Sequence, residues 1–285
     1  MTLSIPTLSL PSGRKMPIFG VGTWRMGESA RARSDEVKAV CGAIERGVTL
    51  IDTAEMYGDG EAETIVAEAM GKGTESRRDE LFIVSKVLPS NSSKPGTIAA
   101  CERSLKRLKT NRIDLYLLHW RGGTPLGDTV AAFEELKSAG KILDWGVSNF
   151  DTADMRELAK LDTRKECATN QVLYNLTRRG IEFDLMPFCR ERSISIMAYS
   201  PLEQARMLDD VVLKQVALRH NATAAQAALA WLIRQKGVIA IPKATSLKHL
   251  DENIAALGLK LTADDLKTLD ARFPPPRRAV PLDML

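Results

Sequence analysis

The sequence is poor in the residues that build metal sites and disulfide frameworks. Its 285 residues include three histidines and four cysteines, and neither type forms a cluster with metal-ligand spacing. A metal site is therefore not expected. The cysteines (Cys41, Cys101, Cys167 and Cys189) are far apart in sequence, and we expect them to be buried free thiols in a reducing compartment.

Long apolar runs and a strong charge excess are also missing. The uncharged stretches 1–13 and 221–233 are shorter than the roughly 20 apolar residues that a membrane-spanning helix needs. No basic start precedes an apolar block, so a secretory signal is not expected. Lysine and arginine (40) barely exceed aspartate and glutamate (36), and the two signs are interspersed. We therefore expect a cytoplasmic protein that binds neither membranes nor nucleic acid.

The glycine motifs of several enzyme classes are absent. Gly20-Val21-Gly22 lacks the third glycine of a dinucleotide fingerprint and precedes no immediate helical pattern. Residues 146–150 are not a nucleophile elbow, because Phe150 stands where glycine is required. No phosphate-binding P-loop occurs.

Short apolar runs alternate with amphipathic segments along the whole chain. The runs are continuous rather than alternating, which is typical of parallel strands covered on both faces. Helical patterns fit between them; Asp151 and Thr223 stand where helix caps are expected. The predicted strands are 19–22, 49–53, 81–87, 113–119, 142–148, 168–173, 194–199 and 238–241.

This alternation predicts an α/β fold, a (β/α)8 TIM barrel formed by residues 1–285 as a single domain. Segment 8–18, turning at Ser12-Gly13, predicts a β-hairpin before the barrel. The three prolines after Phe273 predict an irregular tail.

Polar residues end several of the predicted strands. In a β/α barrel the carboxyl ends of the strands meet at one face, where active sites lie. We therefore expect these side chains to share one cavity. They are Asp52, Lys86, His119, Ser148, Asn149, Gln171, Tyr199, Ser200 and Lys243.

Lys86 is the most informative of them. A buried ammonium is unfavourable without an anion, and Asp52 on the neighbouring strand is the expected partner. The pair could simply fix strand register. Tyr57, five residues after Asp52, favours a catalytic site, since a nearby ammonium lowers the pKa of a phenol. His119 alone would be a core histidine, but its convergence with the other three favours catalysis.

Eight short motifs, in order along the chain, resemble those of the aldo-keto reductase superfamily. The similarity in style is greatest to bacterial reductases of methylglyoxal and other small carbonyls. The motifs are Gly-Thr-Trp at 22–24, Asp-Thr-Ala-Glu-Met-Tyr-Gly at 52–58, Ser-Lys at 85–86, Leu-Leu-His-Trp at 117–120, Gly-Val-Ser-Asn-Phe at 146–150, Asn-Gln at 170–171, Tyr-Ser-Pro-Leu at 199–202 and Ile-Pro-Lys at 241–243.

The resemblance implies an NADPH-dependent oxidoreductase that reduces small aldehydes and ketones, such as methylglyoxal, to alcohols by hydride transfer. It implies a catalytic tetrad of Asp52, Tyr57, Lys86 and His119. Tyr57 would be the general acid, with its pKa lowered by Lys86, while His119 would orient the carbonyl oxygen. A monomer is the oligomeric state that the resemblance implies.

The resemblance also implies binding residues. Tyr199 would stack on the nicotinamide, and Lys243, Ser246 and His249 would meet the adenosine phosphate. Many members have arginine at His249, so we expect a weakened NADPH preference, with NADH possible. The implied cofactor residues are Thr23, Asp52, Ser148, Asn149, Gln171, Tyr199, Ser200, Pro201, Leu202, Lys243, Ser246, His249, Glu252 and Asn253. The implied substrate residues are Trp24, Met56, Tyr57, His119 and Trp120.

Two alternatives stay open at this level. An aldolase-type barrel would use Lys86 to form a Schiff base, although a charged lysine paired with Asp52 argues against it. A regulatory subunit that senses nicotinamide cofactor could share the fold. Segment 121–127 and the C-terminal tail are short for the family, so the resemblance implies an open substrate pocket.

Overall fold

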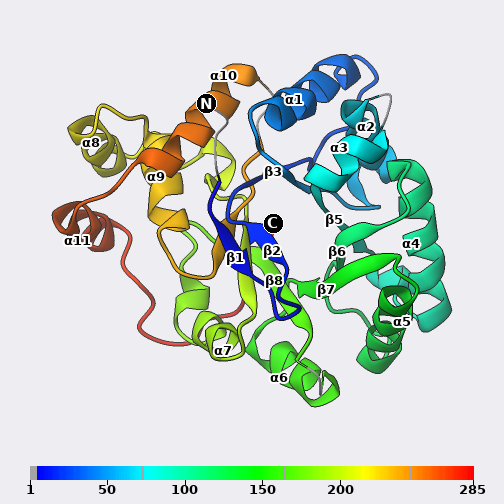
Figure 1. Cartoon of the computed structure of the whole chain (residues 1–285). Helices are drawn as coiled ribbons and strands as arrows, with labels where there is room; N and C mark the ends of the chain where they lie inside the picture. Colours follow the sequence, from blue (N-terminus) through cyan, green and yellow to red (C-terminus); the bar gives the residue numbers. More distant parts are fainter. Residues whose placement is uncertain (1–4, 72–73, 163–164, 244–245) are drawn as a thin grey trace.

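Eight short parallel strands form the centre of the molecule. The computed structural model describes residues 5–71, 74–162, 165–243 and 246–285. The strands neighbour one another in chain order, and a parallel bridge between Phe19 and Ala240 joins the last to the first. The barrel of Figure 1 is thereby closed, as predicted. The strands are β3 (Gly20–Gly22), β4 (Leu50–Asp52), β5 (Phe82–Val87), β6 (Ile113–Leu118), β7 (Ile142–Ser148), β8 (Cys167–Leu173), β9 (Ser195–Tyr199) and β10 (Val238–Ala240).

Helices surround the barrel on its outside (Figure 1). Two of the predicted caps are confirmed, since Asp151 and Thr223 each form a capping box at the start of a helix. The α-helices are α1 (Arg33–Glu45), α2 (Glu61–Met70), α3 (Thr74–Glu80), α4 (Lys94–Leu108), α5 (Leu126–Ser138), α6 (Thr152–Leu161), α7 (Leu185–Glu191), α8 (Val211–Arg219), α9 (Ala224–Ile233), α10 (Leu247–Ala255) and α11 (Ala263–Arg272). Short 3-10 turns are η1 (Tyr57–Gly60), η2 (Pro89–Asn91), η3 (Gly180–Glu182), η4 (Glu203–Ala205) and η5 (Ala256–Gly258).

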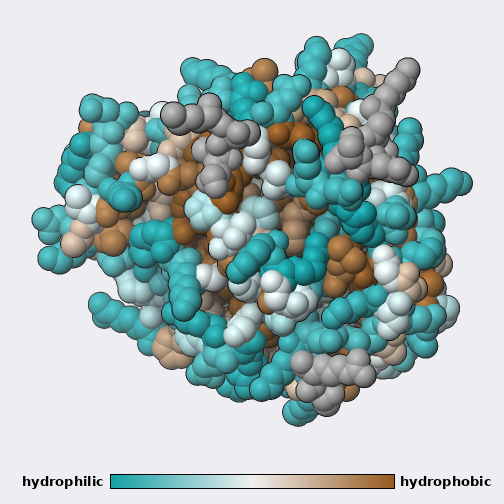
Figure 2. Space-filling view, viewed as in Figure 1, coloured by the Kyte–Doolittle hydropathy of each residue, from teal (hydrophilic) through white to brown (hydrophobic). Residues whose placement is uncertain are grey.

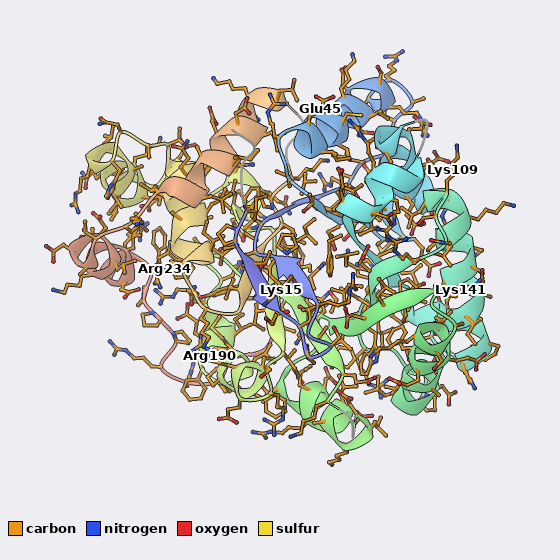
Figure 3. All side chains as sticks on the ribbon, in the orientation of Figure 1. Lys15, Glu45, Lys109, Lys141, Arg190 and Arg234 are labelled. Atoms are coloured by element: carbon orange, nitrogen blue, oxygen red, sulfur yellow. The ribbon has the colours of Figure 1, made fainter. Side chains whose placement is uncertain are left out.

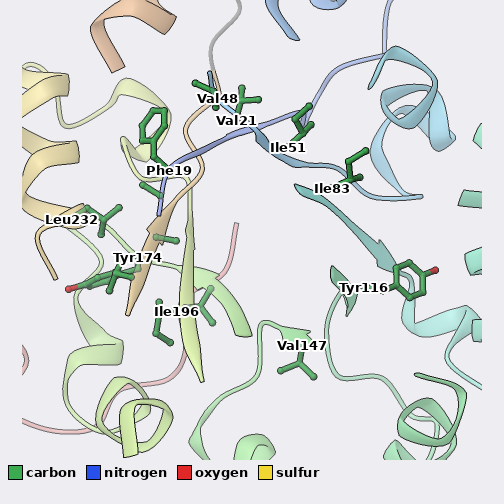
Figure 4. Packing of buried hydrophobic residues seen from close by; sticks show 14 of the residues in the cluster. Phe19, Val21, Val48, Ile51, Ile83, Tyr116, Val147, Tyr174, Ile196 and Leu232 are labelled. Atoms are coloured by element: carbon green, nitrogen blue, oxygen red, sulfur yellow. The ribbon is translucent and has the colours of Figure 1, made fainter. Parts of the chain in front are cut away.

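Side chains alternate along the strands between two apolar clusters. One cluster lies between strands and helices, and includes Ile51, Ile83 and Tyr116 (Figure 4). The other contains Leu50, Phe82, Val84, Leu115 and Leu117 and fills the barrel interior. Because successive side chains of a strand point to opposite faces, Asp52, Lys86 and His119 continue the interior series.

A hairpin closes the amino end of the barrel. Strands β1 (Thr7–Ser9) and β2 (Lys15–Pro17) pair antiparallel, and Gly13 adopts φ +84° in the turn between them, as the predicted hairpin requires. The hairpin crosses in front of the barrel in Figure 1. Its Leu10 and Met16 are buried against the interior cluster.

Arg14 of the hairpin connects it to the barrel by charge. Its guanidinium contacts the carboxylates of Asp114 (2.6 Å) and Asp144 (2.9 Å), both buried at the amino ends of their strands. Arg78 forms a second buried ion pair with Asp114. The charges at this end are therefore paired with one another.

Polar side chains predominate at the edge of the face shown in Figure 2. Hydrophilic side chains cover most of the rim in Figure 2, and charged side chains such as Glu45, Lys109 and Lys141 lie there in Figure 3. Among the described residues, no helix combines the length and apolar character needed to cross a bilayer. All four cysteines are free, although Cys41 is only half-buried, with its Sγ 3.1 Å from the Ala69 carbonyl oxygen.

Beyond α11 the tail has no regular structure, as predicted. Its last residues nevertheless return to the barrel axis (Figure 1). Asp283 lies 3.5 Å from Arg178, and the main chain of Leu285 contacts the Tyr199 hydroxyl. The tail is therefore close to the carboxyl ends of the strands, where an open mouth was expected.

Candidate active site

The four predicted catalytic side chains meet at the carboxyl end of the barrel. The Lys86 ammonium donates to Asp52 Oδ2 (2.8 Å), to the Thr53 carbonyl (2.9 Å) and to the Tyr57 hydroxyl (3.2 Å). The rings of Tyr57 and His119 are 5.7 Å apart in an edge-to-face arrangement. Lys86, Asp52 and His119 are all buried.

Lys86 is held in its charged form. Burial lowers the pKa of Lys86, but Asp52 and Tyr57 outweigh it and leave the pKa above its ordinary value. A protonated amine is not a nucleophile, so this geometry disfavours Schiff-base formation at Lys86.

The expected direction of the Tyr57 pKa was wrong for the free protein. Burial of the hydroxyl raises the pKa of Tyr57, and the nearby Lys86 ammonium offsets only part of this effect. The charge of Asp52 raises it further. Tyr57 is therefore a protonated phenol at neutral pH.

His119 is a neutral imidazole. Burial and, to a smaller extent, the Lys86 charge lower the pKa of His119 well below its ordinary value. Its main-chain N–H is bonded to Val87, whereas Nδ1 is buried and has no partner among the described residues. A neutral imidazole can donate from one ring nitrogen and accept at the other, so the ring is able to orient a carbonyl oxygen without carrying charge.

Gln171 reaches the tetrad through an irregularity in the sheet. Its Nε2 donates to Asp52 Oδ1 (2.8 Å), so both oxygens of Asp52 have partners. Two residues of β7 pair with three of β8 between Trp145 and Val147. A bulge of this kind turns later side chains to the other face. Ala168 and Gln171 consequently both face the interior.

Three other predicted residues form a connected group beside the tetrad. The Tyr199 hydroxyl donates to Asn149 Oδ1 (3.0 Å), and Asn149 Nδ2 donates to the His119 carbonyl (3.1 Å). Ser148 donates to the Gln171 carbonyl (2.9 Å). Burial raises the pKa of Tyr199 to about 12, so this ring is neutral.

The predicted phosphate-binding residues lie farther along the same rim. Lys243 is half-buried, and Ser246 caps α10 by accepting from the His249 N–H. Burial lowers the pKa of Lys243, while Glu36 and Glu28 partly counteract this. Sequence reasoning missed these two carboxylates, because they precede Lys243 by more than 200 residues. Glu252 is half-buried and Asn253 buried on α10.

The predicted substrate residues lie at the mouth. Trp24 and Trp120 are half-buried and Met56 is 47% exposed, in contrast to the core residues Trp145 and Trp231. The His119 and Trp120 rings are 5.0 Å apart. Thr23 is buried, and its hydroxyl donates to the Asp52 carbonyl (3.0 Å).

Comparison with known proteins identifies the family. The sequence profile described as the aldo/keto reductase family matches residues 19–272. The chain belongs to the aldo/keto reductase family. This aldo/keto reductase is 49% identical to methylglyoxal reductase YeaE of Escherichia coli, over 95% of each chain. It is 38% identical to glyoxal reductase of Bacillus subtilis, over 93% of this chain and 92% of that protein.

Solved structures agree with this assignment. An aldo-keto reductase from Klebsiella pneumoniae in complex with NADPH superposes with a TM-score of 0.93 and 46% identity, covering 99% of this chain and 100% of that one. At such identity, the likeness includes the family as well as the (β/α)8 fold.

The reductase also contains site-shaping residues that sequence reasoning missed. The segment after Tyr199 has positive φ at Ser200 and at the three residues of η4. Glu203 in this segment is buried and bonded to Asn175 (2.9 Å) and Arg178 (3.0 Å). These contacts stabilise the predicted cofactor segment Ser200, Pro201 and Leu202. A glutamate one residue after the Tyr-Ser-Pro-Leu motif was the available signal.

The described residues contain no cluster of three or more potential metal ligands.

Proposed function

We propose that this reductase uses NADPH to reduce small aldehydes and ketones, with methylglyoxal as a representative substrate. The observation that carries the proposal is the Tyr57 hydroxyl, 3.2 Å from the buried Lys86 ammonium and next to the neutral His119. This arrangement supplies a proton and stabilises the anion that remains after its transfer. The names of the two similar reductases, for methylglyoxal and glyoxal, support the substrate class.

The donor set beside the tetrad fits a nicotinamide carboxamide. Gln171 uses Nε2 for Asp52, and its Oε1 has no protein donor in the part of the chain that the structure describes. That oxygen is free to accept from the carboxamide NH2, while the partly exposed Tyr199 ring offers a stacking surface. Lys243, Ser246 and His249 would hold the adenosine phosphate, with Glu252 and Asn253 near adenine. The NADPH complex of the similar Klebsiella pneumoniae protein supports NADPH as the cofactor.

Bound NADPH supplies a hydride to the carbonyl carbon. Tyr57, protonated because its pKa is raised, donates its proton to the carbonyl oxygen as that oxygen gains negative charge. Lys86, kept charged by Asp52, stabilises the phenolate that remains. The neutral His119 orients the carbonyl oxygen by a hydrogen bond. Trp24, Met56 and Trp120 form the apolar walls around a small substrate.

The test follows loss of NADPH absorbance with methylglyoxal for the native chain and for Tyr57→Phe. We expect the variant to lose about 10²–10⁴-fold in kcat, the range typical of general acid catalysis. Unchanged binding of NADP⁺ to the variant, measured by fluorescence quenching, controls for its folding. Full activity of Tyr57→Phe would exclude Tyr57 as the proton donor, and no native activity despite NADPH binding would favour the regulatory alternative.

A further inference from the structure

A buried glutamate connects the segment that carries Tyr57 to the loop after the Lys86 strand. Glu55 is 9% exposed, and its Oε1 accepts from the main-chain N–H of Leu88 (2.8 Å) and from Asn91 Nδ2 (2.9 Å). Its Oε2 is 3.5 Å from the half-exposed Arg103. The two short contacts therefore belong to one oxygen, and both come from the loop after β5.

These contacts begin where the main-chain pairing of β4 and β5 ends. The N–H of Glu55 donates to the Lys86 carbonyl at 3.3 Å, the final main-chain bond between the two segments. The chain then turns away toward Met56 and Tyr57. The next hydrogen bond is made by a side chain, since the Glu55 carboxylate accepts from the main-chain N–H of Leu88, just beyond the end of β5.

The backbone just after Tyr57 turns through three residues of positive φ, one of which is not glycine. Gly58, Asp59 and Gly60 all have positive φ (55°, 52° and 92°), which is unfavourable for Asp59. Strained backbone persists only where surrounding contacts over-determine it. Arg107, bonded to the buried Glu63, packs on Gly60, and Glu55 ties the chain just before Tyr57 to the loop after β5.

We propose that Glu55 is a positioning residue for proton transfer, which holds the Tyr57 hydroxyl at hydrogen-bonding distance from Lys86 by joining the loops after β4 and β5. The inference rests on the proposed function of Tyr57. Glu55 does not touch the reacting atoms, so its effect is on the distance and orientation of Tyr57 relative to Lys86.

The experiment compares Glu55→Ala and Glu55→Gln under single-turnover conditions, with NADPH and methylglyoxal. Glu55→Ala should slow hydride transfer by about 10–100-fold, since a misplacement of about 1 Å can cost about 100-fold. Glu55→Gln should stay within about threefold of the native rate, because one amide oxygen can still accept both short bonds. Arg103→Ala, which removes only the long contact, should match the native chain.

The second readout separates positioning from general destabilisation. In the direction of alcohol oxidation, Tyr57 must be a phenolate, and a longer distance to Lys86 raises the pKa of Tyr57. The ascending, acid-side limb of the pH–rate profile for alcohol oxidation should therefore move up by about half a pH unit or more in Glu55→Ala. The matched control is Asp114→Asn, which alters another buried carboxylate that accepts a main-chain N–H of β5, from Ile83 (3.0 Å). It should lower the melting temperature without moving this limb.

A native rate and an unmoved limb in Glu55→Ala would overturn the proposal, whatever the loss of stability. If Glu55→Ala does not fold, Asn91→Ala removes one bond from the partner loop instead. A loss of about threefold or more then supports the proposal, and the native rate overturns it. Activity retained in Tyr57→Phe would be a failure of the proposed function and not of Glu55, so the two failures are distinguishable.

Discussion

The two ends of the barrel both contain buried charges, but they use them differently. At the amino end, Asp114 and Asp144 are paired with Arg14 and Arg78, and the hairpin covers them. At the carboxyl end, Asp52 and Lys86 are also paired, yet the ammonium has a further contact with Tyr57. His119 Nδ1 there has no partner among the described residues.

The two clusters differ in whether any charged or polar group can still interact with a ligand. Removing one member of such a pair leaves the other charge buried and unpaired, which destabilises the fold, and charges paired with one another have no remaining capacity for a ligand. A charged lysine beside a protonated phenol can still act in catalysis, because it stabilises the phenolate that forms when the proton is transferred. The comparison predicts that substitutions at the carboxyl end change activity, and those at the amino end change stability.

The largest expected effect is at the carboxyl end. Lys86→Met should reduce kcat by about 10²–10⁴-fold, because the phenolate of Tyr57 loses its nearest positive charge. The double variant Lys86→Met/Tyr57→Phe should be little slower than either single variant, since the two residues act as a unit. Steady-state kinetics with methylglyoxal measure both. Multiplicative losses in the double variant would contradict a shared role.

At the amino end, Arg14→Ala should lower the free energy of unfolding by about 3 kcal/mol and leave kcat within about twofold. Burial already raises the pKa of Asp144, and losing Arg14 raises it further. A carboxyl group whose pKa is higher in the folded than in the unfolded state lowers the free energy of unfolding as pH rises through the folded-state pKa. The difference in unfolding free energy from the native chain should therefore shrink as pH falls and Asp144 becomes protonated, which urea unfolding at several pH values measures. A kcat loss as large as that of Lys86→Met would break the comparison.

The smallest expected effect concerns cofactor binding at the rim of the barrel, away from both clusters of buried charges. His249→Arg should lower KM for NADPH by about 3–10-fold, since a guanidinium can grip a phosphate bidentately. KM for NADH should not change, because NADH lacks that phosphate. Initial-rate kinetics with both cofactors check this. An equal change for both would place His249 away from the phosphate.

Much of the fold could be predicted from the sequence. All eight predicted strands are present, with ends within a residue or two of the observed ones. Continuous apolar runs between helical patterns are typical of parallel strands covered on both faces, which is why the prediction succeeded. The hairpin and the caps at Asp151 and Thr223 followed from local turn and cap chemistry. The single-domain organisation, the monomeric state and the cytoplasmic location stay predictions.

The finer features of the site could not be predicted. The contact between Gln171 and Asp52 depends on a bulge in β8, and a one-residue slip leaves no mark in the local pattern. Glu55 lies between two motif residues, and nothing in its neighbours indicates Leu88 or Asn91 as partners. The direction of the Tyr57 pKa depends on the balance of burial against a nearby charge, which only the assembled site fixes.

The sequence by itself determined the order of strands and helices and which polar residues end the strands, because hydrophobic periodicity and capping are local. It therefore determined that Asp52, Lys86 and His119 would share one end of a barrel. The tertiary structure alone decided the distances between them, the protonation of Tyr57, the partners of Glu55 and Gln171, and the return of the tail to Tyr199. These features depend on contacts between segments far apart in the chain, and such contacts form only when the barrel has closed.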